Sequence, residues 1–152
     1  MSRFAEGTVV SVQKSKTEIE ALIKKYKASG YISGYGEGKA FVMFMLENRC
    51  IRFNLRLPSA GDETFSRVKG RNMVAAIEQE ERRLWRSLLL VIKAKLESAE
   101  SGIETIDEAF LAQTVMPNGQ TVGQWSKENL QDALVAGKMP QIPMLSWKEP
   151  SV

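Results

Sequence analysis

Apolar and polar residues alternate along the first part of the chain and recur at helical spacing along the second part. Residues 39–46 are apolar on both faces, and residues 50–57 alternate with their apolar members on one side, so both segments predict strands. Glu47-Asn48 between them suits a tight turn. Strand 39–46 is expected inside a sheet, either covered on both sides or with one side free to bind.

Two further segments complete the predicted sheet. Thr8–Val12 is rich in β-branched residues and predicts a strand, and the glycine-rich stretch Tyr31–Gly38 predicts a short strand that runs into a turn. Between them, a capping box at Ser15 to Glu18 and an apolar stripe from Ile19 to Tyr26 predict a helix. The expected order of this part is β-α-β-β-β.

The second part of the chain predicts helices. A long helix is expected over residues 73–101, and because Leu88–Ile92 is apolar all round, this stretch is expected to be its most buried part. Capping boxes begin a short helix at Thr105 and another at Thr121, which is expected to reach Ala136. The predicted fold class is α+β: a mixed or antiparallel N-terminal sheet packed on the long helix, then two shorter helices and an extended tail.

The length of 152 residues predicts a single domain, 1–152. Within it, residues 1–58 form the sheet with one helix, residues 71–137 form the helical part, and residues 138–152 form an extended tail anchored by Trp147. The segment 58–70 between the two parts carries Pro58, Gly61 and Gly70 and predicts a loop.

The composition excludes several kinds of chemistry. The chain has no histidine, which removes the commonest general base and metal ligand, and a Ser-His triad cannot be built. The lone Cys50 permits no internal disulfide, and its place in a strand indicates a small packed side chain. Carboxylate chemistry is only disfavoured, because Asp107-Glu108 at a helix start suit the helix dipole. We therefore expect no enzyme activity, no metal and no cofactor.

Localisation and partners follow from the same features. The N-terminus lacks an apolar signal core, and the longest apolar run, Leu88–Ile92, is too short for a bilayer span. The expected location is the cytoplasm, without membrane contact. Net charge is +3, but residues 1–60 carry ten Lys/Arg against five Asp/Glu, which indicates an acidic partner for this part. An ordinary solvated surface would also explain this uneven distribution of charge.

One strand resembles a known nucleic-acid motif. The run Gly38-Lys-Ala-Phe-Val-Met-Phe44 resembles the third strand of the RNA-recognition motif, in which aromatic rings stack on bases. Glu37 and Lys39 depart from it, since a basic and an aromatic residue belong there, and the next element is a strand where that fold needs a helix. The pattern therefore favours an ordinary central strand.

Even without that motif, the basic and aromatic residues of the predicted strands between residues 31 and 57 could form a surface for nucleic acid. Together they have the composition of a platform for single-stranded nucleic acid. The alternative is an exposed sheet face with solubilising charges. The candidate binding residues are Tyr31, Tyr35, Lys39, Arg49, Arg52 and Arg56.

Six stretches spread over the chain carry a resemblance to a known family: Phe4-x-x-Gly-Thr-Val-Val, Lys16–Ile23, Arg52–Pro58, Trp85–Leu96, Phe110-Leu-Ala and Met116–Gly123. They resemble a family of small uncharacterised proteins of tailed bacteriophages and prophages. The resemblance covers most of the chain and implies a phage origin, with an intracellular role in the infected bacterium. It carries no known activity and no known site residues.

Two functions are predicted from these observations. The first is a nucleic-acid-binding accessory of phage replication or recombination, motivated by the basic, aromatic-bearing first 60 residues. The alternative is a protein-binding inhibitor of a host enzyme or antiphage defence complex, motivated by small size and the lack of catalytic residues. The expected partner is thus nucleic acid or a host protein, and the long helix is a candidate for homo-oligomer formation.

Overall fold

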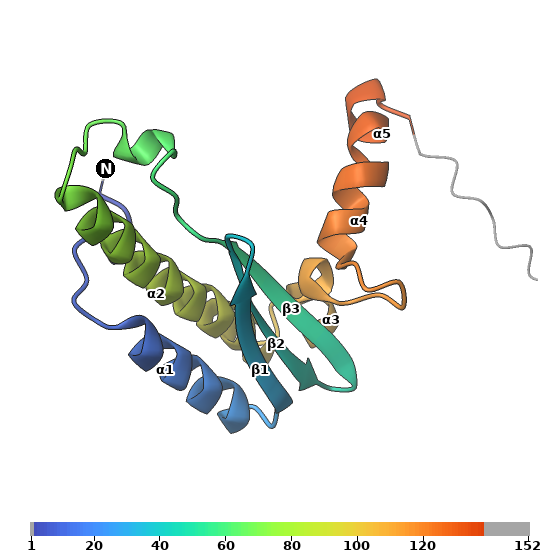
Figure 1. Cartoon of the computed structure of the whole chain (residues 1–152). Helices are drawn as coiled ribbons and strands as arrows, with labels where there is room; N and C mark the ends of the chain where they lie inside the picture. The colour runs from blue at the N-terminus through green and yellow to red at the C-terminus, as the bar shows by residue number, and fades with distance from the viewer. Residues whose placement is uncertain (1, 139–152) are drawn as a thin grey trace, which may run out of the picture.

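A computed structural model describes residues 2–138, which form an α+β structure with helices packed on one face of a small sheet (Figure 1). Because helices α4 and α5 stand away from this body beyond the last strand, they leave most of their surface exposed. In chain order the elements are α1 (Val12–Lys25), β1 (Ser29–Gly36), β2 (Lys39–Leu46), β3 (Arg49–Arg56), the 3-10 turn η1 (Glu63–Phe65), α2 (Asn72–Glu100), α3 (Ile106–Ala109), the 3-10 turn η2 (Leu111–Gln113), α4 (Val122–Asn129) and α5 (Gln131–Ala136).

The sheet is an antiparallel meander in the order β1-β2-β3. Two-residue turns join its strands, at Glu37-Gly38 and at Glu47-Asn48, and all four residues have positive φ. Such turns are of type I′, whose twist matches that of the flanking strands. β2 and β3 pair without interruption from Lys39 opposite Arg56 to Leu46 opposite Arg49, whereas β1 carries a bulge near its start.

The alternation of β2 separates two faces of the sheet, as the pattern predicted. Ala40, Val42, Phe44 and Leu46 are buried beneath the helices, and the intervening residues lie on the other side. The helix-covered face packs against α1, α2 and the segment after α3. The core consists of Ile19, Ile23, Ala40, Val42, Phe44, Leu46, Ile51, Phe53, Trp85, Leu88, Ile92, Leu96, Ala109 and Phe110.

Phe110 closes the core beneath the last two strands. It is fully buried, and its ring meets those of Phe44 and Phe53 edge-on, with centroids 6.2 Å away in both cases. The chain then pairs with the outer edge of β3, where the N–H of Val115 donates to the C=O of Cys50 at 2.8 Å. This segment thus protects one edge of the sheet.

The predicted first strand is wrong. Residues 8–11 have no regular structure, and α1 begins at Val12 with Ser11 as its cap, so Ser15 lies buried inside the helix. The β-branched residues favour extended backbone, but the segment runs beside α2 instead of a strand. There the side-chain amide of Gln79 donates to the C=O of Thr8 at 2.8 Å, which supplies the bond that a sheet would have made.

The expectation that Leu88–Ile92 is the most buried part of the long helix is also wrong, since the preceding turn, Leu84–Leu88, has no exposed residue. Leu88 and Ile92 are buried, but Leu90 and Val91 are 43% and 42% exposed, because the sheet and the other helices contact only one side of α2. The helix itself matches its predicted span within one residue at each end. Among the described residues, no helix has the length and hydropathy needed to cross a bilayer.

Of the three predicted capping boxes, those at Thr105 and Thr121 are confirmed. The one at Ser15 to Glu18 is wrong, because Ser11 caps α1 and Ser15 lies within the helix. The helix expected from Thr121 to Ala136 breaks at Leu130 into α4 and α5. The predicted loop 58–70 contains η1, which buries Phe65. The predicted extended tail with Trp147 lies outside the described residues, apart from Lys138.

Candidate functional site

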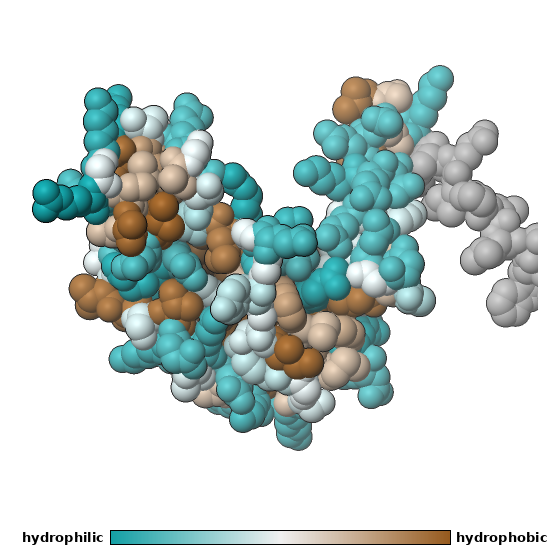
Figure 2. Space-filling view, viewed as in Figure 1, coloured by the Kyte–Doolittle hydropathy of each residue, from teal (hydrophilic) through white to brown (hydrophobic). Residues whose placement is uncertain are grey.

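The sheet face turned away from the core is the main candidate surface, and we name it the open face. Strand register assigns its residues, and none of them is acidic. Side chains over the strands form the pale and brown area at the centre of Figure 2, and a notch separates this body from α4 and α5. The open-face residues are Ile32, Gly34, Gly36, Lys39, Phe41, Met43, Met45, Cys50, Arg52, Asn54 and Arg56.

An aromatic ring lies at the middle of the open face. Phe41 on β2 pairs with Gly34 on β1 and with Asn54 on β3. A Cβ atom added to Gly34 would stand 2.6 Å from Cε1 and 2.8 Å from Cζ of the ring, so the ring occupies the place of a side chain at that position. Phe41 therefore leans across β1, stays partly exposed, and requires glycine beneath it.

Three cations share the open face with this ring. Lys39 lies opposite Arg56 at the hairpin end of the face, and its ammonium group has no ion pair or hydrogen bond to the residues that the structure describes. Arg56 Nη2 is 2.5 Å from Asp62 Oδ1, which offsets its charge. Arg52 Nη2 donates to the C=O of Gly119 at 2.9 Å and to Gln124 Oε1 at 3.2 Å, and these partners are neutral. The open face thus keeps a net positive charge.

The six predicted binding residues do not share one face. Lys39, Arg52 and Arg56 lie on the open face, whereas Tyr31, Tyr35 and Arg49 lie on the helix-covered side of the sheet. Strand alternation is the reason, since residues an odd number of positions apart on one strand point to opposite sides. The aromatic residue that stands beside the cations is therefore Phe41, not a tyrosine.

Arg49, Tyr31 and Tyr35 lie on the helix-covered side of the sheet, and none of them adds to the open face. Arg49 Nη1 lies 2.5 Å from Asp107 Oδ1 and so ties β3 to α3. Tyr31 is half-buried, and burial raises the pKa of its hydroxyl. Tyr35 is 82% exposed near the β1–β2 turn and points away from Phe41.

A hollow of about 330 Å³ extends the open face beyond the edge of β3. Arg52 and Asn54 line its inner side, and Gln124 and Lys127 of α4 line its outer side. This adds a fourth cation that sequence reasoning missed, because segments about 70 residues apart build the hollow and no local pattern joins them. Phe41 was also missed, although the alternation of β2 had separated its side from the core-facing side.

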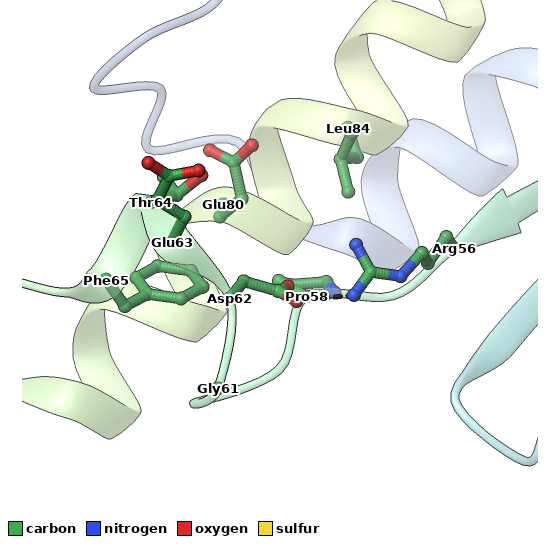
Figure 3. A pocket seen from close by; sticks show the side chains of 9 residues that line it. All are labelled: Arg56, Pro58, Gly61, Asp62, Glu63, Thr64, Phe65, Glu80 and Leu84. Carbon is green, nitrogen blue, oxygen red and sulfur yellow. Dashed lines mark hydrogen bonds and ion pairs between the residues drawn. The ribbon is translucent and has the colours of Figure 1, made fainter.

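A second hollow, of about 480 Å³, lies beside Arg56 at the other end of β3. In Figure 3, Arg56 points toward Asp62, while Glu63 and Glu80 lie beyond Asp62, on the side away from Arg56. The carboxylates of Asp62 and Glu80 are already neutralised by ion pairs with arginines. Among the described residues, no three His, Cys, Asp or Glu side chains stand close enough together to hold a metal ion. These ion pairs join the end of β3 to the loop and the N-terminal arm to α2, so the charged groups of the hollow have structural partners.

Hydrogen bonds and ion pairs lower the pKa of the Asp62 and Glu80 carboxyls. For Glu80 the main cause is the hydrogen bond from Arg83, whose Nη2 lies 2.8 Å from Oε1, with a smaller contribution from Arg3. For Asp62 the main cause is the backbone N–H of Ser59, which donates at 2.8 Å, followed by Arg56.

These shifts predict an acid-sensitive contact. A carboxyl whose pKa is lower in the folded state stabilises the fold above its unfolded pKa, and this contribution is lost as the pH falls through the folded value. Denaturant unfolding between pH 7 and pH 3 should therefore show a stability loss that begins below about pH 4.5 and is smaller in Glu80→Gln. Glu78→Gln, on the exposed side of α2, is the control. Equal acid slopes for both variants would contradict the assignment.

Comparisons with protein-family models, with curated proteins and with solved structures returned no match to this chain. What the chain does is therefore inferred from its own geometry, and the open face is its most distinctive surface.

Proposed function

We propose that this chain is a non-enzymatic accessory protein that binds single-stranded nucleic acid on the open face of its sheet. The observation that carries the proposal is the partly exposed ring of Phe41, which lies over Gly34 on a face without acidic residues that also carries Lys39 and Arg52. An aromatic ring stacks on any base, and neighbouring cations attract the phosphates.

The arrangement favours single strands over duplexes. A ring that lies along the sheet presents its plane only to bases that are unpaired and turned outward, because paired bases hide their faces in the stack. Asn54, exposed beside Phe41, adds an amide that donates and accepts hydrogen bonds at a base edge. The hollow with Lys127 offers a route along which the phosphates of a bound strand would run from the ring toward α4.

The cellular setting is part of the same proposal. The resemblance of stretches such as Trp85–Leu96 to small proteins of tailed bacteriophages supports a setting in the cytoplasm of the infected bacterium. Within that setting, the proposed ligand suits phage DNA replication or recombination. Single-stranded DNA is abundant at both processes and matches the ligand that the open face suits.

A titration tests the proposed ligand. Fluorescence anisotropy with a single strand of about 12 nucleotides should show binding that is tighter than to a duplex and weaker at about 200 mM salt than at about 50 mM. Lys39→Glu should weaken binding and reduce the salt dependence by about one phosphate contact. Lys25→Glu makes an equal change of charge at an exposed position of α1 and should leave both the affinity and the salt dependence unchanged. Absence of binding at low salt, or equal loss in both variants, would count against the proposal.

Protein binding is the second candidate. Ile32 and Met45 are exposed at the end of the open face that lies away from Lys39, and exposed apolar side chains are typical of protein interfaces. A host enzyme or antiphage defence complex is the kind of partner this alternative supposes. A pull-down from bacterial lysate with and without nuclease separates the two, since a stoichiometric protein that survives nuclease treatment would favour this function.

A further inference from the structure

The two edges of the sheet differ in their protection. The outer edge of β3 pairs with Thr114 and Val115, as described above. The outer edge of β1 makes no backbone hydrogen bond to another segment of residues 2–138. Unpaired edge strands readily accept another strand, so natural proteins usually block them with charges, proline or bulges.

β1 has little of this protection. Its sequence, Ser29-Gly-Tyr-Ile-Ser-Gly-Tyr-Gly36, contains no charged residue and no proline. The bulge lies between Ser29 and Ile32, which leaves the stretch from Ile32 to Gly36 in regular register with β2. Five residues at the hairpin end of β1 therefore form a regular and uncharged free edge.

Hairpin geometry identifies the backbone groups on that edge. Because a two-residue type I′ turn joins β1 to β2, the closing pair of Gly36 and Lys39 exchanges hydrogen bonds across the hairpin. Alternation then directs the backbone groups of Gly34 and Ile32 toward β2 as well. The N–H and C=O groups of Ser33 and Tyr35 point outward, where no strand of residues 2–138 meets them.

We propose that two copies of this chain pair through these edges, with a two-fold axis at Gly34. In an antiparallel self-pairing, opposite residues must share a face, so the axis has to pass through a residue and not between two. Centring on Gly34 uses the whole regular stretch. Ser33 of each copy then faces Tyr35 of the other, and the two pairs exchange four backbone hydrogen bonds.

The side chains along this seam fit the pairing. On the open face, Gly34 meets the same glycine of the second copy, and Ile32 meets Gly36, so no bulky pair collides. On the helix-covered side, Tyr35 loses solvent contact against Ser33 of the second copy. Uncharged residues at every position avoid the repulsion that a like-charged pair would cause.

Pairing would also join the two open faces. A two-fold axis perpendicular to the sheet keeps both open faces on one side, which gives six continuous strands with all helices behind them. Each Phe41 ring reaches the Cβ position of its own Gly34, and such positions in opposite strands are about 5 Å apart. The two rings would therefore meet at the seam, so that each copy contributes an aromatic residue to one shared platform, a consequence that rests on the proposed function.

Light scattering or sedimentation, without nucleic acid, tests the pairing. The unmodified chain is expected at twice its mass of 17.0 kDa. Tyr35→Lys places like charges near the axis and should give the single-chain mass. Ser33→Pro should do the same, since it removes an outward N–H while leaving the bonds to β2 intact. Leu134→Lys is the matched control, because Leu134 is 81% exposed, as Tyr35 is 82%, but lies on α5.

Three results would overturn the pairing. The unmodified chain could have the single-chain mass up to its solubility limit. Both edge variants, with circular dichroism spectra that show an intact fold, could keep the double mass. The double mass could also be lost only in Leu90→Lys, which would place the interface on the exposed side of α2. The anisotropy titration fails or succeeds independently, so a dimer that binds no nucleic acid contradicts only the proposed function.

Discussion

Phe110→Ala is expected to lower the free energy of unfolding by about 3–5 kcal/mol. Phe110 is fully buried and fills the space between Phe44 and Phe53, both of which it meets edge-on. Truncation removes the ring and leaves a cavity that strands on one side and α2 on the other cannot close. Urea unfolding followed by circular dichroism would measure the change.

The neighbouring residue supplies the control. Leu111 is 56% exposed, so Leu111→Ala should change the stability by no more than about 0.5 kcal/mol. A similar small effect for Phe110→Ala would mean that the segment after α3 does not dock on the sheet as described. In that case the pairing of Val115 with Cys50 would also need revision.

Phe41→Ala is expected to weaken binding of single-stranded nucleic acid by about 10- to 100-fold. Stacking of one base on an aromatic ring contributes about 1–3 kcal/mol, and every 1.4 kcal/mol is about tenfold in the dissociation constant. Phe41→Trp keeps a stacking ring and should retain most of the affinity. Anisotropy titration of the three proteins at one salt concentration would measure the differences.

The control for this substitution is an aromatic residue away from the open face. Phe4 is exposed in the N-terminal arm, and Phe4→Ala should leave the dissociation constant unchanged. Since Phe41 is partly exposed, its truncation is also expected to leave the fold intact, which a circular dichroism spectrum would show. Unchanged affinity in a folded Phe41→Ala protein would exclude the ring as a stacking platform.

The elements predicted well are those with local causes. Turn residues at Glu47-Asn48 and the alternation on either side of them define β2 and β3, and each capping box lies within four consecutive residues. The failures have non-local causes. Thr8–Val12 has the residues of a strand, but the position beside α2 offers a glutamine amide and no strand to pair with. Strand propensity depends on local sequence alone, so it does not predict which segment will lie beside residues 8–12 in the folded chain.

The candidate site shows the same division. Assigning Lys39, Arg52 and Arg56 to one surface needs only strand alternation and the register across one turn. Phe41 follows Lys39 by two residues, so the same alternation places it on this face. That its ring lies over Gly34 depends on the direction of the side chain, which alternation does not give. The hollow with Lys127 depends on where α4 packs, about 70 residues later in the chain, and no local sequence pattern contains that relation.

The contact between Phe41 and Gly34 limits which residues related sequences can carry at the two positions. Any residue larger than glycine at position 34 must displace the ring, and any smaller residue at position 41 leaves the glycine uncovered on an exposed strand. Sequences that diverge from this chain but keep the ring over β1 should therefore keep glycine at position 34. Glycine at the first together with an aromatic residue at the second is a signature by which distant relatives with the same surface can be distinguished from those that share only the scaffold.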